Sequence, residues 1–134
     1  MALEIHDDAT ADLRQIRSDD PVAFGRLFAL LQHLRADETA QTKLLDHGFG
    51  SNKDEDFSVS KWLSTFRRVP AWRLKFWDLE KQGLKYRIIY VWVWRERAFY
   101  VMAVVRRDTL DYDDINDPIR QRVARSCRAD FPDL

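Results

Sequence analysis

The chain has 134 residues, enough for one domain with an ordinary hydrophobic core, which we expect to span residues 1–134. A hydrophobic content of 46%, an aromatic content of 13% and only four glycines exclude a disordered chain. The net charge is zero, with 22 basic and 22 acidic side chains, and this total alone argues against a nucleic-acid partner.

The first third of the chain predicts a short strand and two helices. Ala2–His6 alternates enough for an edge strand, and Asp8 is placed to cap a first helix. Asp20 followed by Pro21 predicts the start of a second helix, because proline at the first helical position gives up an amide that has no partner. The second helix should end near Arg35, and the short connection makes the pair an antiparallel hairpin. Its expected apolar stripe comprises Val22, Leu27, Leu30, Leu31 and Leu34.

The middle of the chain mixes clear and ambiguous patterns. Thr42–Leu45 is expected to extend a helix, and Gly48–Asn52 is expected to form a loop. Phe57–Phe66 is compatible with a strand or with a single helical turn. In Ala71–Trp77 apolar and basic residues alternate, which predicts a half-buried strand that leads through a turn at Asp78–Gly83.

The chain is organised around Leu84–Arg107, in which two apolar runs are separated by Arg95–Arg97. Their valine, isoleucine and aromatic residues predict a hairpin that is buried on both faces. Asp117–Pro118 then begins a C-terminal helix. Its expected stripe comprises Ile115, Ile119, Val123 and Cys127, the last a small core residue. The predicted fold class is α+β: an N-terminal strand and helical hairpin packed on an antiparallel sheet of three consecutive strands, then a C-terminal helix.

Several classes of protein are excluded by what the chain lacks. No apolar run is long enough for a membrane helix, and the N-terminus lacks the basic and apolar regions of a signal peptide. We therefore expect a cytoplasmic protein with no membrane partner. His6, His33 and His47 are scattered, and no carboxylate cluster has the spacing of a magnesium site, so we expect no metal and no cofactor.

Charge is distributed unevenly along the chain. Residues 61–107 carry 12 basic and 3 acidic side chains, whereas residues 1–60 carry 6 and 12 and residues 108–134 carry 4 and 7. A localised positive field is the feature expected of a protein that binds a polyanion. The alternative is a solvated sheet face beside acidic helices.

The register of the central hairpin decides where its cations lie. If Arg95–Glu96 is a two-residue turn, Arg87 pairs with Val104 and Lys85 pairs with Arg106. This register places Arg87 and Arg106 on one face as diagonal neighbours.

The preceding strand can add two more cations to that face. If Arg73 pairs with Arg87, Lys75 pairs with Lys85 and these cations converge, whereas a one-residue slip sends Arg73 and Lys75 to the other face. Like charges opposed across a sheet repel, so converging cations make most sense around a phosphate backbone.

Three segments resemble one protein family. Tyr86–Tyr90, YRIIY, looks like the strand signature of the RelE/ParE superfamily of bacterial toxins. Trp72–Lys75 resembles the preceding strand, and Val104–Arg106 followed by Tyr112 resembles the closing strand with its late arginine and tyrosine. The resemblance extends over the order of elements, and its motifs cover Trp72 to Tyr112.

For the RelE branch, the resemblance implies the toxin of a type II toxin-antitoxin module. Such a toxin is an endoribonuclease that cuts mRNA on the ribosome and is neutralised by a cognate antitoxin protein. The family's catalytic residues correspond to Arg73, Lys75, Arg87, Arg106 and Tyr112 in this chain. Additional RNA contacts are expected from Lys85, Arg107 and Arg68. The chain departs from most members in its length, its neutral net charge and an acidic insertion at residues 48–56.

The implied chemistry is attack by the RNA 2′-hydroxyl on the adjacent phosphate, giving a cyclic phosphate and a free 5′-hydroxyl. Arginine stays protonated, so the arginines would stabilise charge on the phosphorane. Lys75 is the candidate base if neighbouring cations lower its pKa, and Tyr112 would stack on a base or donate a proton.

Three alternative interpretations are open at this point. In the first, Arg73 and Lys75 lie on the solvated face of a half-exposed strand, and Tyr112 packs on the last helix without a functional role. A ParE-like inhibitor of DNA gyrase needs the fold but not the converging cations. A non-enzymatic RNA-binding module needs the cations but no chemistry.

Overall fold

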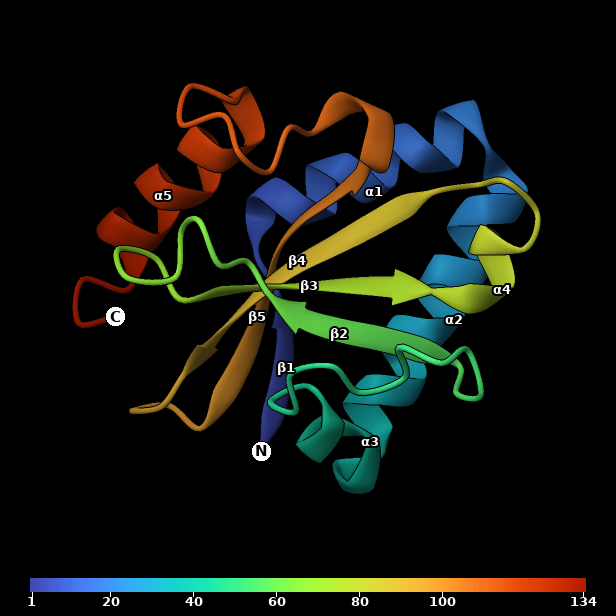
Figure 1. The fold of residues 1–134 in the computed structure, drawn as a ribbon, viewed down its shortest axis with the longest axis horizontal. Helices are drawn as coiled ribbons and strands as arrows, with labels where there is room; N and C mark the ends of the chain where they lie inside the picture. The colour runs from blue at the N-terminus through green and yellow to red at the C-terminus, as the bar shows by residue number, and fades with distance from the viewer.

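Five strands form one sheet in the order β1-β5-β4-β3-β2 in the computed structural model, which describes residues 1–134 (Figure 1). The strands are β1 (Ala2–Ile5), β2 (Phe57–Lys61), β3 (Ala71–Phe76), β4 (Tyr86–Val93) and β5 (Ala98–Arg106). The helices are α1 (Asp7–Asp19), α2 (Pro21–Ala36), α3 (Glu38–Lys43), α4 (Trp77–Glu80) and α5 (Pro118–Asp130), with a 3₁₀ turn η1 at Arg107–Thr109. The predicted α+β class is confirmed. The sheet is wider than the three consecutive strands predicted, because β1 joins it in parallel beside β5 and β2 joins it antiparallel beside β3.

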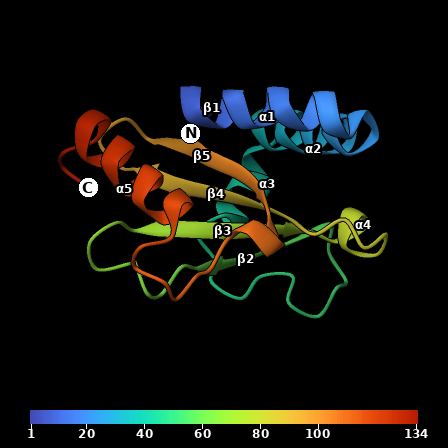
Figure 2. The same cartoon turned by 90° about the horizontal axis from the view of Figure 1, so that it is seen from above.

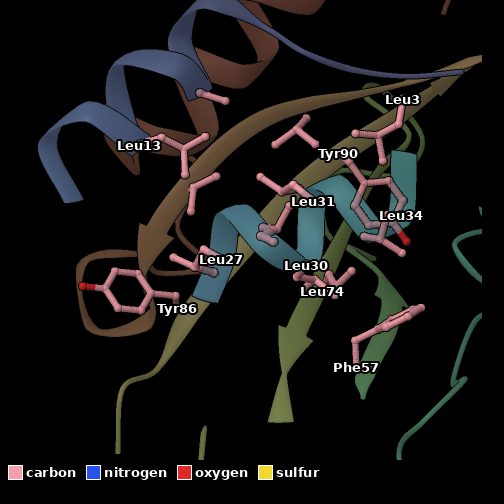
Figure 3. Packing of buried hydrophobic residues seen from close by; sticks show 14 of the residues in the cluster. Leu3, Leu13, Leu27, Leu30, Leu31, Leu34, Phe57, Leu74, Tyr86 and Tyr90 are labelled. Atoms are coloured by element: carbon pink, nitrogen blue, oxygen red, sulfur yellow. The ribbon is translucent and has the colours of Figure 1, made fainter. Parts of the chain in front are cut away.

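Two hydrophobic cores lie on opposite faces of this sheet, because successive side chains of a strand point to opposite sides. In the first core, leucines of α1 and α2 pack against alternate strand residues such as Leu74 and Tyr90 (Figure 3). Figure 2 shows the α1–α2 hairpin as a layer along one side of the strands. The second core is smaller and places Val123 and Cys127 of α5 against Ile89. The prediction of a hairpin buried on both faces is therefore confirmed.

The helix starts follow local capping rules. Asp20 and Asp117 accept hydrogen bonds from backbone amides of the first turns of α2 and α5, and each is followed by proline, as predicted. The cap of α1 differs from the prediction. His6, not Asp8, is the N-cap, and its Nδ1 accepts a hydrogen bond from the Asp8 N–H at 3.1 Å. The His6 ring nitrogen therefore caps α1, a role that was predicted for the Asp8 carboxylate.

The ambiguous segments resolve into shorter elements. Phe57–Phe66 is a strand only as far as Lys61, and turns follow. Thr42 and Lys43 form the end of the helix α3 and Leu44 is its C-cap, so the helix expected at Thr42–Leu45 is present only in part. The expected turn after β3 contains the one-turn helix α4. None of the helices combines the length and the apolar character that crossing a lipid bilayer requires.

Two residues assigned to apolar stripes are exposed instead. Val22 lies in the first turn of α2 with 63% of its surface exposed, and Ile115 precedes α5 with 68% exposed. Val22 belongs to the exposed first turn of the helix, whereas Ile115 lies in a turn before α5 and not in the helix itself.

The ladder between β4 and β5 contains a β-bulge. Tyr90 pairs with Val101, but the next residue, Ile89, pairs with Ala103, so Met102 has no partner. An extra residue on one strand shifts every later pair by one position. Met102 and Ala103 both belong to the second core, as the bulge requires.

Beyond the bulge, each β5 side chain points to the face of the sheet opposite to the one that it would have in a regular strand. Arg87 lies opposite Val105, and Arg106 lies opposite Tyr86. Val105 packs against the second core, whereas Tyr86 belongs to the first core. The predicted pairs that are wrong by one residue are Arg87 with Val104 and Lys85 with Arg106.

Asp12 of α1 joins three elements. Its carboxylate accepts hydrogen bonds from both Nη atoms of Arg122 in α5, at 2.9 and 2.6 Å, and from the backbone N–H of Val104 in β5 at 3.0 Å. The β1 ladder ends with the pair Ile5–Val101, so β1 does not reach far enough to pair with the Val104 amide. A buried amide needs an acceptor, and Asp12 supplies it.

Both outer strands have backbone groups that are covered by other parts of the chain. On β2, the N–H of Gly48 donates to the Val59 carbonyl and the N–H of Val59 donates to the Phe49 carbonyl, each at 3.0 Å. On β1, the Leu3 carbonyl accepts a hydrogen bond from Nε of Arg35 at 3.1 Å.

Replacing Asp12 with alanine should lower the free energy of unfolding by about 2–4 kcal/mol, because it leaves the Arg122 guanidinium and the Val104 amide without their acceptor. Urea denaturation of the purified chain measures this loss. The control is Glu38→Ala, since the Glu38 side chain is 80% exposed and should change stability by less than about 0.5 kcal/mol. Equal effects of the two substitutions would contradict the role given to Asp12.

Candidate functional site

The pairing of β3 with β4 brings three predicted site residues onto one face. Lys75 lies opposite Arg87, and Arg73 lies opposite Ile89. The predicted pairs of Arg73 with Arg87 and of Lys75 with Lys85 are therefore wrong by two residues. A shift of two positions preserves the face of every side chain. Arg73, Lys75 and Arg87 consequently share the face of the second core, as predicted.

Tyr112 contacts one of these cations, Arg73, and adds a fourth, Arg107. The guanidinium carbon of Arg73 is 4.3 Å from the centre of the Tyr112 ring, and that of Arg107 is 4.5 Å from it. Arg107 comes from η1, directly after β5. We call Arg73, Lys75, Arg87, Arg107 and Tyr112 the basic cluster.

Arg106 is the predicted catalytic residue that the structure keeps apart from the basic cluster. The bulge at Met102 turns it to the side of Tyr86, where it is exposed and its Nε lies 3.4 Å from Oδ1 of Asp108. Its neighbour Arg107, expected only as an RNA contact, takes the place beside Tyr112. The one extra residue of the bulge therefore places Arg107, and not Arg106, beside Tyr112.

The remaining predicted RNA contacts lie elsewhere. Lys85 is exposed and directly precedes β4, and its carbonyl accepts a hydrogen bond from the Arg107 N–H at 2.7 Å. Arg68 is in the connection between β2 and β3, where it lines a cavity together with α5. Neither side chain is part of the basic cluster.

Arg87 is the buried member of the cluster, with 5% of its surface exposed. Its Nη1 donates to the carboxylate of Glu80, from α4, and to the Tyr86 carbonyl, while its Nε has no hydrogen-bond partner. A buried charge is tolerated when it is paired, and the Glu80 side chain is itself only 12% exposed. Glu80 thus holds Arg87 in place.

Burial and neighbouring charges change the proton affinity of two cluster residues. Partial burial lowers the pKa of Lys75 below its ordinary 10.5, and Arg87, Arg73 and Arg107 lower it further while Glu80 opposes them. Burial raises the pKa of Tyr112 above 10, and the same arginines oppose that rise. Lys75 therefore releases its proton more readily than a free lysine, and Tyr112 keeps its phenolic proton.

Comparisons of the chain with protein-family models, with curated proteins and with solved structures find no match. The chemical capacity of the site therefore rests on its own geometry. No three His, Cys, Asp or Glu side chains gather in a group that could hold a metal ion. The cluster instead offers guanidinium and ammonium donors on one face of the sheet, a set suited to phosphate oxygens.

Two contributing residues were missed in the sequence. Glu80 is one of three acidic residues in the basic segment, a signal that was available. Ser60 of β2 accepts a hydrogen bond from Nε of Arg73 at 2.8 Å, and it was hidden in the segment with ambiguous structure. Ser60 fixes the plane of the Arg73 guanidinium from the opposite strand.

Replacing Arg73 with glutamine should raise the pKa of Lys75 toward 10.5, because it removes one of the cations that destabilise the ammonium form. Titration of the Lys75 Cε–Hε resonance by NMR measures this shift. The matched control is Arg106→Gln, which removes the same charge from the other face and should leave the Lys75 titration unchanged. A Lys75 pKa that responds equally to both variants would show that the cluster does not act on it.

Proposed function

We propose that this chain is an endoribonuclease toxin that cuts mRNA through attack by the RNA 2′-hydroxyl. The observation that supports this most is the basic cluster: the guanidinium groups of Arg73 and Arg107 lie against the Tyr112 ring, and Lys75 lies opposite Arg87, which pairs with Glu80. Such a concentration of positive charge is costly in a free protein and becomes favourable when a phosphodiester occupies it.

In this proposal Arg73 and Arg107 stabilise the transition state. Attack forms a bond between the 2′-oxygen and phosphorus, breaks the bond from phosphorus to the 5′-oxygen, and places extra negative charge on the phosphoryl oxygens. Both guanidinium groups are already fixed, Arg73 by Ser60 and Arg107 by its Nη1 hydrogen bond to the Leu110 carbonyl at 2.7 Å. Donors fixed in advance stabilise developing charge most effectively.

Lys75 is the proposed general base. In its neutral form, Lys75 accepts the proton of the 2′-hydroxyl. The lowered pKa of Lys75 makes this neutral form more accessible. Arg87 acts through Lys75 and is a positioning residue, since it lies opposite Lys75 in the sheet and is almost fully buried. The departing 5′-oxygen takes a proton from solvent.

Tyr112 is also a positioning residue in this proposal. Its ring carries two guanidinium groups, its edge packs on Trp62 with ring centres 5.3 Å apart, and it is 8% exposed. These contacts favour a support for Arg73 and Arg107 over a platform for a base. The raised pKa keeps the phenol neutral, so the ring adds no charge to oppose the phosphate.

The resemblance to the RelE/ParE superfamily adds biological context to the proposal. A site with one weak base depends on precise placement of the RNA, and a ribosome is a means of supplying it. The cognate antitoxin would be a protein with an acidic segment that neutralises the basic cluster. Cytoplasmic action on mRNA follows from the same proposal.

Arg107→Ala should reduce RNA cleavage by about 100-fold or more, because it removes a fixed donor from the charge that develops on phosphate. Arg106→Ala is the control and should change cleavage by less than about threefold, since the bulge places this neighbour on the other face. Cleavage of a labelled mRNA in a purified translation system measures both. The reverse order of effects would defeat the proposed site.

Lys75→Met should remove the rise in cleavage rate with increasing pH that a lysine base produces. In the wild-type chain the rate should climb toward a pKa below 10.5, because the neutral amine accumulates as pH rises. Single-turnover rates across pH measure this profile.

Induced expression in bacteria tests the proposed function against its alternatives. Growth arrest with intact messages and broken chromosomes would favour gyrase inhibition, and RNA binding without cleavage would favour a non-enzymatic module.

A further inference from the structure

A second concentration of cations lies outside the basic cluster, in a cavity of about 690 Å³ between α5 and the connection that follows β2. We call this cavity the arginine groove. The arginines that line it are Arg67, Arg68, Arg120, Arg125 and Arg128. No aspartate or glutamate lines it. An anionic ligand therefore meets no repulsion from the walls of the groove.

Four of these arginines are available to a ligand. Arg120 is used by the fold, since its Nη2 donates to the Ser64 carbonyl at 2.8 Å and its Nη1 to Ser64 Oγ at 3.2 Å. The side chains of the other four form no ion pair or hydrogen bond within the chain, and all four residues are exposed. Arg125 and Arg128 are three residues apart on α5, so they project from neighbouring positions of one helix face.

The two walls of the groove are held firmly in place. Asp117 caps α5 through the amides of Ile119 and Arg120, and the Arg122–Asp12 pair ties α5 to α1. The opposite wall is attached to the same structure through Arg120. The walls that carry the arginines are therefore fixed before a ligand binds, and only the arginine side chains lose freedom on binding.

The groove adjoins the basic cluster through one residue. The carbonyl of Tyr112 accepts hydrogen bonds from Trp62 Nε1 at 2.9 Å, from Ser64 Oγ at 2.6 Å and from Arg120 Nη1 at 3.4 Å. The ring of the same tyrosine contacts Arg73 and Arg107 of the cluster. Tyr112 therefore links the basic cluster to Arg120 in the wall of the groove.

The rims of the groove carry exposed apolar side chains. Leu63 is 69% exposed and Ile115 is 68% exposed, and they come from the two opposite walls. Their methyl groups offer contact to the apolar parts of a ligand whose charges bind the arginines. A nucleic-acid strand has this composition, with a charged backbone and apolar ribose and base surfaces.

We propose that the arginine groove binds the sugar–phosphate backbone of the RNA strand that continues from the nucleotides held at the basic cluster. This inference rests on the proposed ribonuclease function, which supplies the substrate class. Guanidinium groups match phosphate oxygens in charge and geometry, and several arginines within one groove match the repeated phosphates of one strand. The groove sets how much RNA the protein holds beyond the cleavage point.

The test measures binding of a fluorescein-labelled, fully 2′-O-methylated RNA of about 12 nucleotides, a length within the range of single-strand binding sites. This probe lacks the attacking hydroxyl, so binding is measured without cleavage. The groove variants are Arg67→Gln with Arg68→Gln, and Arg125→Gln with Arg128→Gln. The matched control is Arg14→Gln with Arg17→Gln, which removes two exposed arginines from α1.

Each groove variant should weaken RNA binding by about tenfold and reduce the dependence of log K on log salt concentration by about 1.4, since each phosphate contact to a single strand contributes about 0.7. The control pair should bind as the wild type does. Groove variants with wild-type affinity and salt dependence would overturn the proposal. Polyglutamate that binds the wild-type chain more tightly than RNA, and requires the same arginines, would also overturn it in favour of an acidic protein partner.

Cleavage of unmodified RNA separates this proposal from the ribonuclease function. The groove variants should cut a trinucleotide as fast as the wild type and a long RNA about tenfold more slowly at low substrate concentration. A wild-type chain that binds the methylated RNA through the groove but cuts no RNA would overturn the nuclease and support the groove. Equal loss of cleavage on both substrates would overturn the groove's separate role.

Discussion

Mutual repulsion among Arg73, Lys75, Arg87 and Arg107 is the constraint around which this face of the sheet is built. Like charges that share one sheet face oppose the folding of the free protein. Glu80 offsets part of this cost by pairing with the most buried of the four, and the Tyr112 ring offsets another part by contacting two guanidinium groups. In the proposed function, a bound phosphate would relieve the residual positive charge. Under that proposal, the stability of the free protein and its affinity for phosphate are opposed at this site.

The layers of the fold were predictable because they follow local rules. Asp20–Pro21 and Asp117–Pro118 each mark a helix start through hydrogen bonds made within one turn of chain. The apolar run of β4 predicted burial on both faces, and two cores confirm it. The alternation in β3 placed Arg73 and Lys75 together on one face, and that face stayed correct although their partners were shifted by two positions.

The details that decide the site depend on tertiary contacts that a linear pattern does not contain. The bulge at Met102 has no turn residue or glycine to mark it, yet it determines that Arg107 rather than Arg106 meets Tyr112. The arginine groove likewise joins two segments about fifty residues apart in the chain, so neither segment alone indicates it. Asp12 is a third case, since its partners lie in β5 and α5.

The covered backbone groups on both outer strands limit how other proteins can bind to this chain. An open sheet with free ladder groups invites a foreign strand to extend it, which is a common route to aggregation and to peptide capture. Here Gly48 and Phe49 form backbone hydrogen bonds with Val59 of β2, and Arg35 donates a hydrogen bond to the Leu3 carbonyl of β1. Strand addition would first have to displace these bonds. A partner protein is thus directed toward side-chain surfaces, where charge and shape select it, and the covered edges protect the chain from self-association through strand pairing.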